Sequence, residues 1–273
     1  SVTAGTTYDS MLDVPTPYAD GGNGRGNYSV INQIAGFSSL TVSDGNLKAS
    51  PTLNTGWHSR SCTTGISSGK WYAEFSMPSI TSGAQGNPVG VGIVPSNTEF
   101  TAIGQLVGDS GRGYGFYCPD TTGSSPNKRV SGTNTSVGTG TATSTTDVFM
   151  VAFDLTNGNA WFGKNGTWYA GDPSAGTSAS ITGISAGEYV FGLSVYRDNT
   201  YTNNTCAINF GQRPFSYTPP SGYSALNTQN LSTPTIANGA TVMAATTYTG
   251  TGATNSIANT VNGVSFKPDF VLS

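Results

Sequence analysis

Hydrophobic and polar residues alternate in short runs along this chain, and turn-forming Gly, Pro, Asn and Asp residues separate the runs roughly every 8–12 residues. The clearest alternation is Lys70–Met77, where Trp71, Ala73, Phe75 and Met77 share one face of a predicted strand. No window of about 11 residues shows a helical period. The pattern predicts an all-β fold, a sandwich of two antiparallel sheets.

The stretch Asp147–Tyr169 carries the strongest hairpin signals. Asn157-Gly158 and Asn165-Gly166 each lie between aromatic or β-branched runs, and both residue types tolerate the positive φ of a type I′ turn. Val148–Phe153 is apolar on both faces, which predicts an inner strand that is covered on both sides. The stretch therefore predicts a three-strand antiparallel unit, completed by Ala160–Gly163 and Thr167–Tyr169.

The same pattern predicts further strands before and after this unit. Gly90 and Gly92 interrupt one of them and indicate close packing by a neighbour. Trp57 and His58 are expected in a loop, and Pro119–Asn127 and Thr133–Thr146 are expected to be polar loops. The further strands are Tyr28–Ile34, Ser39–Val42 and Leu47–Ala49 around an Asp44-Gly45 turn, Arg60–Thr63, Val89–Val94, Tyr114–Cys118, Tyr189–Tyr196 and Cys206–Phe210.

The strand pattern divides the chain into three parts. Residues 1–27 are turn-rich and predict an extended N-terminal arm, and residues 28–231 form the predicted sandwich. Residues 232–273 change in character and predict a linker and the beginning of a following small β module, with strands Val242–Tyr248 and Val264–Leu272. Because the chain starts without Met and stops within a predicted strand, we expect both ends to be cut from a longer polypeptide.

Composition narrows the function classes. Only 9% of the residues are charged and the net charge is −3, so no basic surface for nucleic acid is expected. No apolar run approaches the roughly 20 residues of a membrane helix, so no membrane partner is expected. No cofactor is expected either. Cys62, Cys118 and Cys206 are widely spaced and odd in number, which favours free buried thiols over a zinc site; one internal disulfide is left open.

Candidates for catalysis are few. The one histidine, His58, has no nucleophile-elbow sequence to serve. Glu74 has no second acid nearby, although a glycosidase needs a carboxylate pair. Asp154 with Asn157 and Asn159 is explained better by a hairpin turn than by calcium, so neither a catalytic residue nor a metal is expected.

Three stretches in order resemble the motifs of SPRY (B30.2-like) domains, a family of concanavalin-like sandwiches. The central one is D-V-x-x-V-x-x-D-x-x-N-G-x-x-x-F-x-x-N-G, from Asp147 to Gly166. The others are Ser68–Phe75 with Val89–Ile93, similar to the G-K-x-Y-x-E strand, and Ala207–Phe215 with Pro219–Tyr223, similar to the closing N-F-G-x-x-P-F…P-P-x-G-Y. Tyr8–Asn32 is similar to the SPRY modules of tailed-phage structural proteins.

The resemblance implies a non-enzymatic recognition module in a phage virion, associated with a tail or fibre. Its partners would be a host cell-surface receptor, glycan or protein, or other virion subunits, and homo-oligomerisation is left open. The alternative is a secreted bacterial lectin-like or carbohydrate-active protein on the same sandwich, which would be extracellular.

SPRY domains bind through loops at one end of the sandwich, so the loops are the candidate site. They are Ser82–Asn87, Glu99–Arg112, Pro119–Arg129 and Arg197–Asn204, and the candidate binding residues within them are Arg112, Arg129, Arg197 and Tyr201. We expect replacement of Arg197 and Tyr201 to spare stability, whereas Trp161 and Phe210 should be needed for folding.

Overall fold

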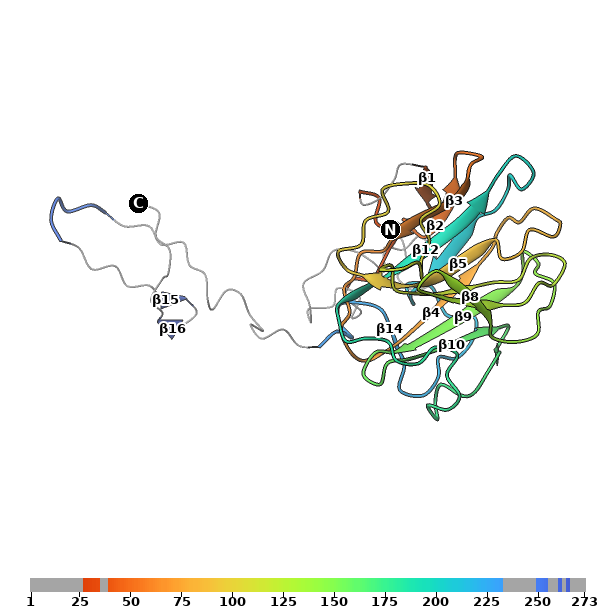
Figure 1. Ribbon diagram of the computed structural model, residues 1–273. Coiled ribbons are helices and arrows are strands. Elements are labelled where there is room, and N and C mark those ends of the chain that lie inside the picture. Colours follow the sequence, from red (N-terminus) through yellow and green to blue (C-terminus); the bar gives the residue numbers. More distant parts are fainter. Residues whose placement is uncertain (1–26, 35–38, 233–248, 255–259, 262–263, 266–273) are drawn as a thin grey trace, which may run out of the picture. The chain divides into compact units, whose positions relative to one another are not determined.

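The computed structural model describes residues 27–34, 39–232, 249–254, 260–261 and 264–265 (Figure 1). The chain divides into two compact units, Ser1–Leu231 and Ser232–Ser273. Within the described residues the secondary structure is strand and turn without helix, so no helix is present that could span a membrane. The predicted all-β sandwich of two antiparallel sheets is confirmed.

One sheet of the sandwich has eight strands in the order β1-β2-β13-β4-β9-β10-β11, with the short β14 pairing in parallel with β4. The predicted inner strand is central here, because β9 lies between β4 and β10 and is almost completely buried. The strands are β1 (Leu40–Ser43), β2 (Lys48–Pro51), β4 (Lys70–Ser76), β9 (Val148–Asp154), β10 (Asn159–Lys164), β11 (Thr167–Trp168), β13 (Cys206–Asn209) and β14 (Ser224–Ala225).

The second sheet has six strands in the order β3-β12-β5-β6-β7-β8, all antiparallel. They are β3 (Gly56–Ser61), β5 (Val89–Pro95), β6 (Tyr114–Tyr117), β7 (Asn127–Val130), β8 (Thr133–Ser136) and β12 (Tyr189–Arg197). In the second unit, β15 (Thr260–Val261) pairs with β16 (Val264–Ser265).

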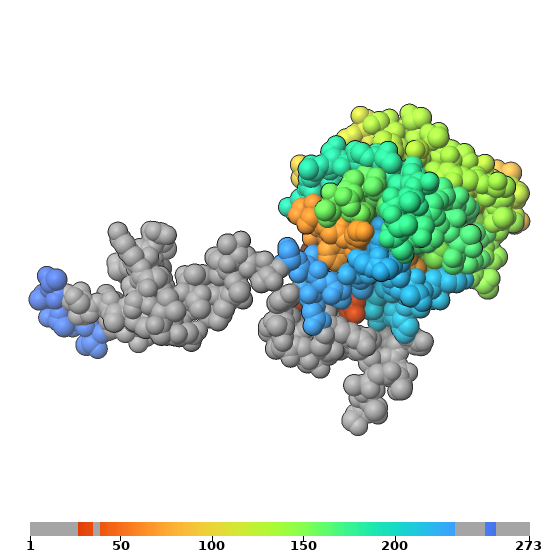
Figure 2. All heavy atoms as spheres, turned by 90° about the horizontal axis from the view of Figure 1, so that it is seen from below, coloured from red at the N-terminus to blue at the C-terminus, as the bar shows by residue number. Residues whose placement is uncertain are grey.

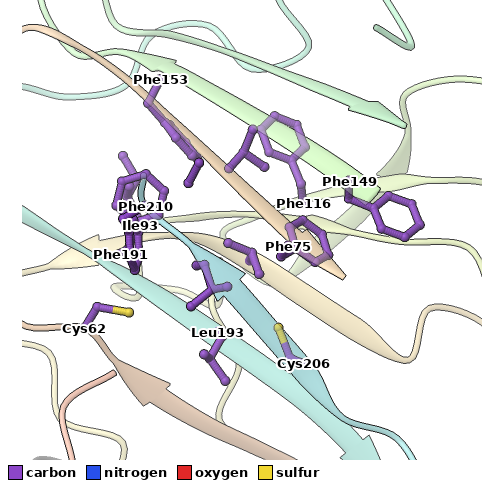
Figure 3. Packing of buried hydrophobic residues seen from close by; sticks show 14 of the residues in the cluster. Cys62, Phe75, Ile93, Phe116, Phe149, Phe153, Phe191, Leu193, Cys206 and Phe210 are labelled. Atoms are coloured by element: carbon purple, nitrogen blue, oxygen red, sulfur yellow. The ribbon is translucent and has the colours of Figure 1, made fainter. Parts of the chain in front are cut away.

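Aromatic rings from both sheets interlock in the core between them (Figure 3). Phe162 of one sheet stacks on Phe116 of the other, with ring centroids 5.1 Å apart. Phe153 meets Phe191 edge to face at 5.5 Å across the same gap. Burial of each such side chain contributes about 1.5–3 kcal/mol, so these contacts hold the two sheets together.

Chain segments also cover the outer faces of both sheets. On the eight-stranded sheet, Trp161 and Tyr72 are buried under residues 168–179 and 215–223, the green-to-blue segments seen in Figure 2. On the six-stranded sheet, Phe100 and Val107 pack over Val94 and Val190. The outward side chains of the inner strands are therefore mostly apolar, and the polar exceptions Glu74 and Ser194 are hydrogen-bonded to the covering segments.

The two Asn-Gly pairs form different turns. Asn165-Gly166 is a two-residue turn with φ of +50° and +81°, as a type I′ turn requires, between the paired residues Lys164 and Thr167. The type I′ prediction was wrong for Asn157-Gly158, because only Gly158 has positive φ and the connection from Asp154 to Asn159 spans four residues. There the Asp154 carboxylate accepts hydrogen bonds from the backbone and side-chain amides of Asn157.

Three other local predictions are corrected. Trp57 and His58 lie in β3 rather than in a loop, and residues 28–32 make isolated bridges instead of a full strand. Residues 127–136 form the β7–β8 hairpin, although Pro119–Asn127 and Thr133–Thr146 were expected to be loops. Its turn is Ser131-Gly132, again with two positive φ values, so Ser fills the position that Asn usually takes.

The three cysteines are free and buried, as predicted. Burial raises the pKa of the Cys118 thiol to about 12, and it raises that of Cys62 even further. Both thiols are therefore protonated and unreactive at neutral pH. Two predictions lie outside the described residues: the N-terminal arm, apart from Asn27, and strand Val242–Tyr248. Of Val264–Leu272, only residues 264–265 are described.

Candidate functional site

Three of the four predicted loops meet at one end of the sandwich. The strand registers pair Val89 with Val195 and Gly90 with Tyr117, so the loops before β5, after β6 and after β12 all emerge on the same side. We call this surface the loop end and define it as residues 81–87, 119–125 and 198–204.

The fourth loop, Glu99–Arg112, leaves the opposite end of β5 and folds over the outer face of the six-stranded sheet. There the backbone amide of Gly104 donates to the carbonyl of Trp57 at 2.9 Å. The amide of Val107 donates to Ser194 Oγ at 3.0 Å. This loop therefore covers the sheet and does not join the loop end.

Asp120 joins two of the loops at the loop end. Its side chain is buried, and Oδ1 accepts hydrogen bonds from the hydroxyl of Thr122 at 2.7 Å and from its amide at 2.9 Å. Oδ2 accepts the Gly86 amide at 2.9 Å, and the Ser124 hydroxyl donates back to the Gly86 carbonyl at 2.5 Å. One carboxylate thus fixes the conformation of its own turn and ties that turn to residues 81–87.

Asn204 joins the third loop to the first in the same way. It is 1% exposed; its Nδ2 donates to Gln85 Oε1 at 2.6 Å and to the Tyr196 carbonyl at 2.9 Å. Its Oδ1 accepts the Thr81 amide at 3.0 Å. Every polar atom of this side-chain amide is hydrogen-bonded. Together, Asp120 and Asn204 join the three loops into one hydrogen-bonded network.

Tyr201 lies on this network. Asp198 Oδ1 accepts the amides of Thr200 and Tyr201 at 2.8 and 2.7 Å, while its Oδ2 accepts the Tyr196 hydroxyl at 2.8 Å. The Tyr201 ring lies so close to Gly83 that a Cβ added there would be 3.1 Å from it. The ring is half-buried, so a fixed aromatic side chain with an accessible part stands at the loop end.

Arg197 is hydrogen-bonded within the fold, which the sequence did not show. Its Nη1 donates to the Pro51 carbonyl at 2.5 Å and its Nε donates to Asn54 Oδ1 at 2.6 Å. It thus anchors the β2–β3 connection to the end of β12. We therefore now expect Arg197→Ala to lower stability, whereas Tyr201 remains the better probe of recognition.

Arg112 and Arg129 lie away from the loop end. Arg112 is the last residue of the Glu99–Arg112 loop, and Arg129 lies nearby in β7. Arg129 makes an ion pair with Asp109 at 2.7 Å and donates to Asn134 Oδ1 at 2.9 Å. The backbone amide and carbonyl of Arg112 bond to Asp109 and Gly108. Of the four predicted binding residues, therefore, only Tyr201 and the adjoining Arg197 lie at this end of the sandwich.

The fully exposed positions of the loop end are uncharged, and the half-buried Asp198 adds one carboxylate. The three segments contain no Lys or Arg, and their two acids, Asp120 and Asp198, are engaged by hydrogen bonds within the loops. Small hydroxyl, methyl and amide side chains make up the exposed positions, which are Ser82, Ala84, Thr122, Ser125, Asn199, Thr200, Thr202 and Asn203. A polar surface of this kind, with a single partly accessible carboxylate, offers mainly neutral hydrogen-bond donors and acceptors.

Acid should loosen the loop end. Burial raises the pKa of Asp120, but the hydrogen bonds from Thr122, Ser124 and Gly86 outweigh it, so the net pKa is below the ordinary value. A lowered pKa stabilises the fold fully above the unfolded-state pKa of about 3.9, and the contribution disappears as pH falls through the folded-state pKa. The stability difference between wild type and Asp120→Asn should therefore shrink below about pH 4.

Melting temperatures of both proteins, measured from neutral pH down to about pH 2, check this. Asp147 follows the same direction: burial raises its pKa, yet hydrogen bonds from Asn165, Ser144 and Lys164 lower it overall. The wild type should therefore lose stability over the same range in which the difference shrinks. A difference that stays constant on acidification would show that Asp120 does not hold the loops as a carboxylate.

The two side chains considered for catalysis are both held in the fold. His58 is 1% exposed in β3, with Nδ1 2.7 Å from Ser39 Oγ. The buried Glu74 carboxylate accepts the Tyr72 hydroxyl at 2.9 Å and the amides of Ser216 and Tyr217 at 2.8 Å each. It therefore fastens the 213–217 segment to β4. Among the residues described, no three His, Cys, Asp or Glu side chains are grouped to hold a metal.

Sequence reasoning missed the residues that organise the site, namely Asp120, Asn204 and Gln85. A local signal existed only for Asp120, since Asp before Thr-Thr-Gly is typical of a turn in which the carboxylate bonds amides two or more residues on. Asn204 and Gln85 act through contacts 119 residues apart in the chain, which no local pattern reveals.

Comparison with known proteins gives likenesses of fold only. No family model matches the chain, and no curated protein matches it. Among solved structures it is similar to the SPRY domain of human HERC1, with 15% identity, a TM-score of 0.43, and coverage of 62% of this chain and 91% of that one.

The TRIM65 PSpry domain gives 8% identity and a TM-score of 0.46 over 67% of this chain and 90% of its own. Stonustoxin gives 17% identity and a TM-score of 0.42, over 67% of this chain and 27% of its own. The strand pairings within the chain itself define the sandwich.

Proposed function

We propose that the sandwich is a non-enzymatic recognition module that binds its ligand through the loop end. The observation that carries the proposal is the network around Asp120 and Asn204, which fixes three loops in one arrangement before any ligand arrives. Preorganised loops lose little conformational entropy on binding, so their contacts translate into affinity.

The chemistry of the loop end indicates the ligand class. Its exposed groups are neutral hydroxyls and amides beside the half-buried ring of Tyr201. Tyrosine offers a rigid apolar face and a hydroxyl, a combination that is common at recognition surfaces. Such a surface suits a hydroxyl-rich ligand, either a glycan or a polar protein surface, better than a strongly charged one.

We further propose that the module belongs to a tailed-phage virion, as a tail- or fibre-associated structural protein. The support is the resemblance of Tyr8–Asn32 to the SPRY modules of such proteins, in a chain whose three other motifs resemble SPRY domains in general. In that setting the loop end would face a host-cell receptor or a neighbouring subunit. The inward hydrogen bonds of Glu74 and the burial of His58 support a binding role over a catalytic one.

A secreted lectin-like protein is the second candidate, because the uncharged hydroxyl and amide surface of the loop end would suit a glycan outside a virion as well. The genes that flank the full-length gene separate the two settings: tail genes support the virion, and a secretory context supports the lectin. The binding surface is the same in both.

Tyr201→Ala tests the proposed site. The probes are a glycan array and bacterial envelope preparations that contain both polysaccharide and surface protein. Where wild type binds, we expect the variant to bind at least about tenfold more weakly, equivalent to 1.4 kcal/mol. Its melting temperature should stay within about 2 °C of wild type, because the ring is only half-buried. Cleavage of a glycan by the wild type would contradict the non-enzymatic role.

A further inference from the structure

Strand β8 forms an uncovered edge of the six-stranded sheet. It is the last strand in the sheet order, and all four of its residues, Thr133–Ser136, are exposed. The other edge strand of this sheet, β3, is flanked at its end by the bridge between Ile31 and Cys62 and by the hydrogen bond from Asn32 to Ser61. Within the described residues, no strand pairs with the outer side of β8.

The hairpin register shows which backbone groups of β8 face outward. Val130 pairs with Thr133 across the two-residue turn, and the Val137 amide donates to the Pro126 carbonyl at 2.9 Å. In an antiparallel pair the hydrogen-bonded positions alternate, so residues 133, 135 and 137 bond toward β7. The amides and carbonyls of Asn134 and Ser136 consequently point away from the sheet.

This edge lacks the features that usually prevent strand addition. It carries no charge, no proline and no bulge, and its side chains are two threonines, an asparagine and a serine. The two cations of the adjacent β7 are both engaged: Lys128 Nζ donates to the Ser180 carbonyl at 2.7 Å, and Arg129 pairs with Asp109. A second β-strand can therefore approach without meeting a free charge.

We propose that β8 pairs in antiparallel fashion with β8 of a second copy of this chain, around a two-fold axis at Thr135. In this register Asn134 of each copy lies opposite Ser136 of the other, and the four outward amides donate to the four outward carbonyls. The two Thr135 residues face each other as a non-hydrogen-bonded pair, and threonine pairs of this kind are favourable.

The identity of the partner follows from this symmetry. When two copies of β8 pair in antiparallel fashion, each copy uses the same strand and the same backbone groups, as a closed two-fold dimer requires. The uncharged side chains place no like charges opposite each other. The six-stranded sheets of the two copies would then continue into one another, and the dimer would present two loop ends.

A cysteine pair tests the register directly. In the proposed dimer the two Thr135 Cα atoms are about 4.5 Å apart, within disulfide range. The two Thr133 residues are four positions apart along the strands, about 13 Å, which is beyond that range. Mild oxidation of the 273-residue chain should therefore link Thr135→Cys into dimers at least about tenfold more than Thr133→Cys.

The controls keep the test clear. The native cysteines are buried, so they should not cross-link the wild type. Thr135→Lys would place two ammonium groups opposite each other and should shift the sedimenting species toward monomer while leaving the fold intact. Equal cross-linking of the two cysteine variants, no cross-linking of either, or identical sedimentation of wild type and Thr135→Lys would each overturn the proposal.

Discussion

Trp161→Ala should lower the free energy of unfolding of the sandwich by about 3–5 kcal/mol. Trp161 is fully buried on the outer side of β10, where it meets the Tyr223 ring edge to face with centroids 6.4 Å apart. Its indole Nε1 donates to the Thr177 carbonyl at 2.9 Å, which fastens the segment after β11 to the sheet. The substitution removes the ring, the hydrogen bond and the cover of the sheet at once.

Trp161→Phe is the matched control, because it keeps an aromatic ring and loses the indole donor. Urea unfolding followed by tryptophan fluorescence and circular dichroism gives both free energies. The alanine variant should be clearly less stable than the phenylalanine variant. Equal and small losses for both variants would mean that residues 168–179 do not cover the sheet as described.

Gly92→Ala should cost about 3 kcal/mol or more, a large effect for one added methyl group. A Cβ at position 92 would lie 2.0 Å from the backbone oxygen of Tyr114 and 2.7 Å from the Cα of Gly115. Both atoms belong to the backbone of β6, so no side-chain rotation can relieve the overlap. Strands β5 and β6 would have to separate, and the six-stranded sheet would lose pairing in its centre.

Gly187→Ala provides the comparison. A Cβ there would meet the Tyr189 ring at 3.5 Å, which is an ordinary van der Waals contact, and the backbone needs no positive φ. This variant should unfold within about 0.5 kcal/mol of wild type. If Gly92→Ala were equally mild, the close approach of β5 and β6 would be incorrect.

The sequence was most informative where local pattern and burial agree. Val148–Phe153 was predicted as an inner strand from its apolar run, and β9 occupies that place because each of its faces packs against apolar side chains. Gly90 and Gly92 were predicted to allow close packing, and both lie against neighbours that a methyl group would overlap.

The sequence was least informative where pairing depends on the turn or on the sheet. The β7–β8 hairpin has few apolar residues, so its strand character comes from pairing with β6 and from the Ser131-Gly132 turn. His58 is polar yet buried, because its strand pairs with β12. Apart from the Ser131-Gly132 turn, no residue pattern within these segments signals either outcome.

The candidate site was half predictable for a related reason. Tyr201 could be found from its residue type and its polar loop. Arg129 and Arg197, in contrast, bond to Asp109 and Asn54, which are distant in the chain. Charged side chains in loops can be tied into the fold or free to bind, and only the three-dimensional arrangement distinguishes these cases.

Binding isotherms of wild type, Tyr201→Ala and Asn97→Trp, measured on one probe that the wild type binds, show whether recognition occurs through the loop end. Asn97 is exposed in the loop after β5, at the end opposite to the loop end, so the added indole should block only a site located there. Recognition through the loop end predicts at least about tenfold weaker binding for Tyr201→Ala and unchanged binding for Asn97→Trp. Full binding by Tyr201→Ala together with lost binding by Asn97→Trp would place recognition at the opposite end of the sandwich and exclude the loop end as the binding surface.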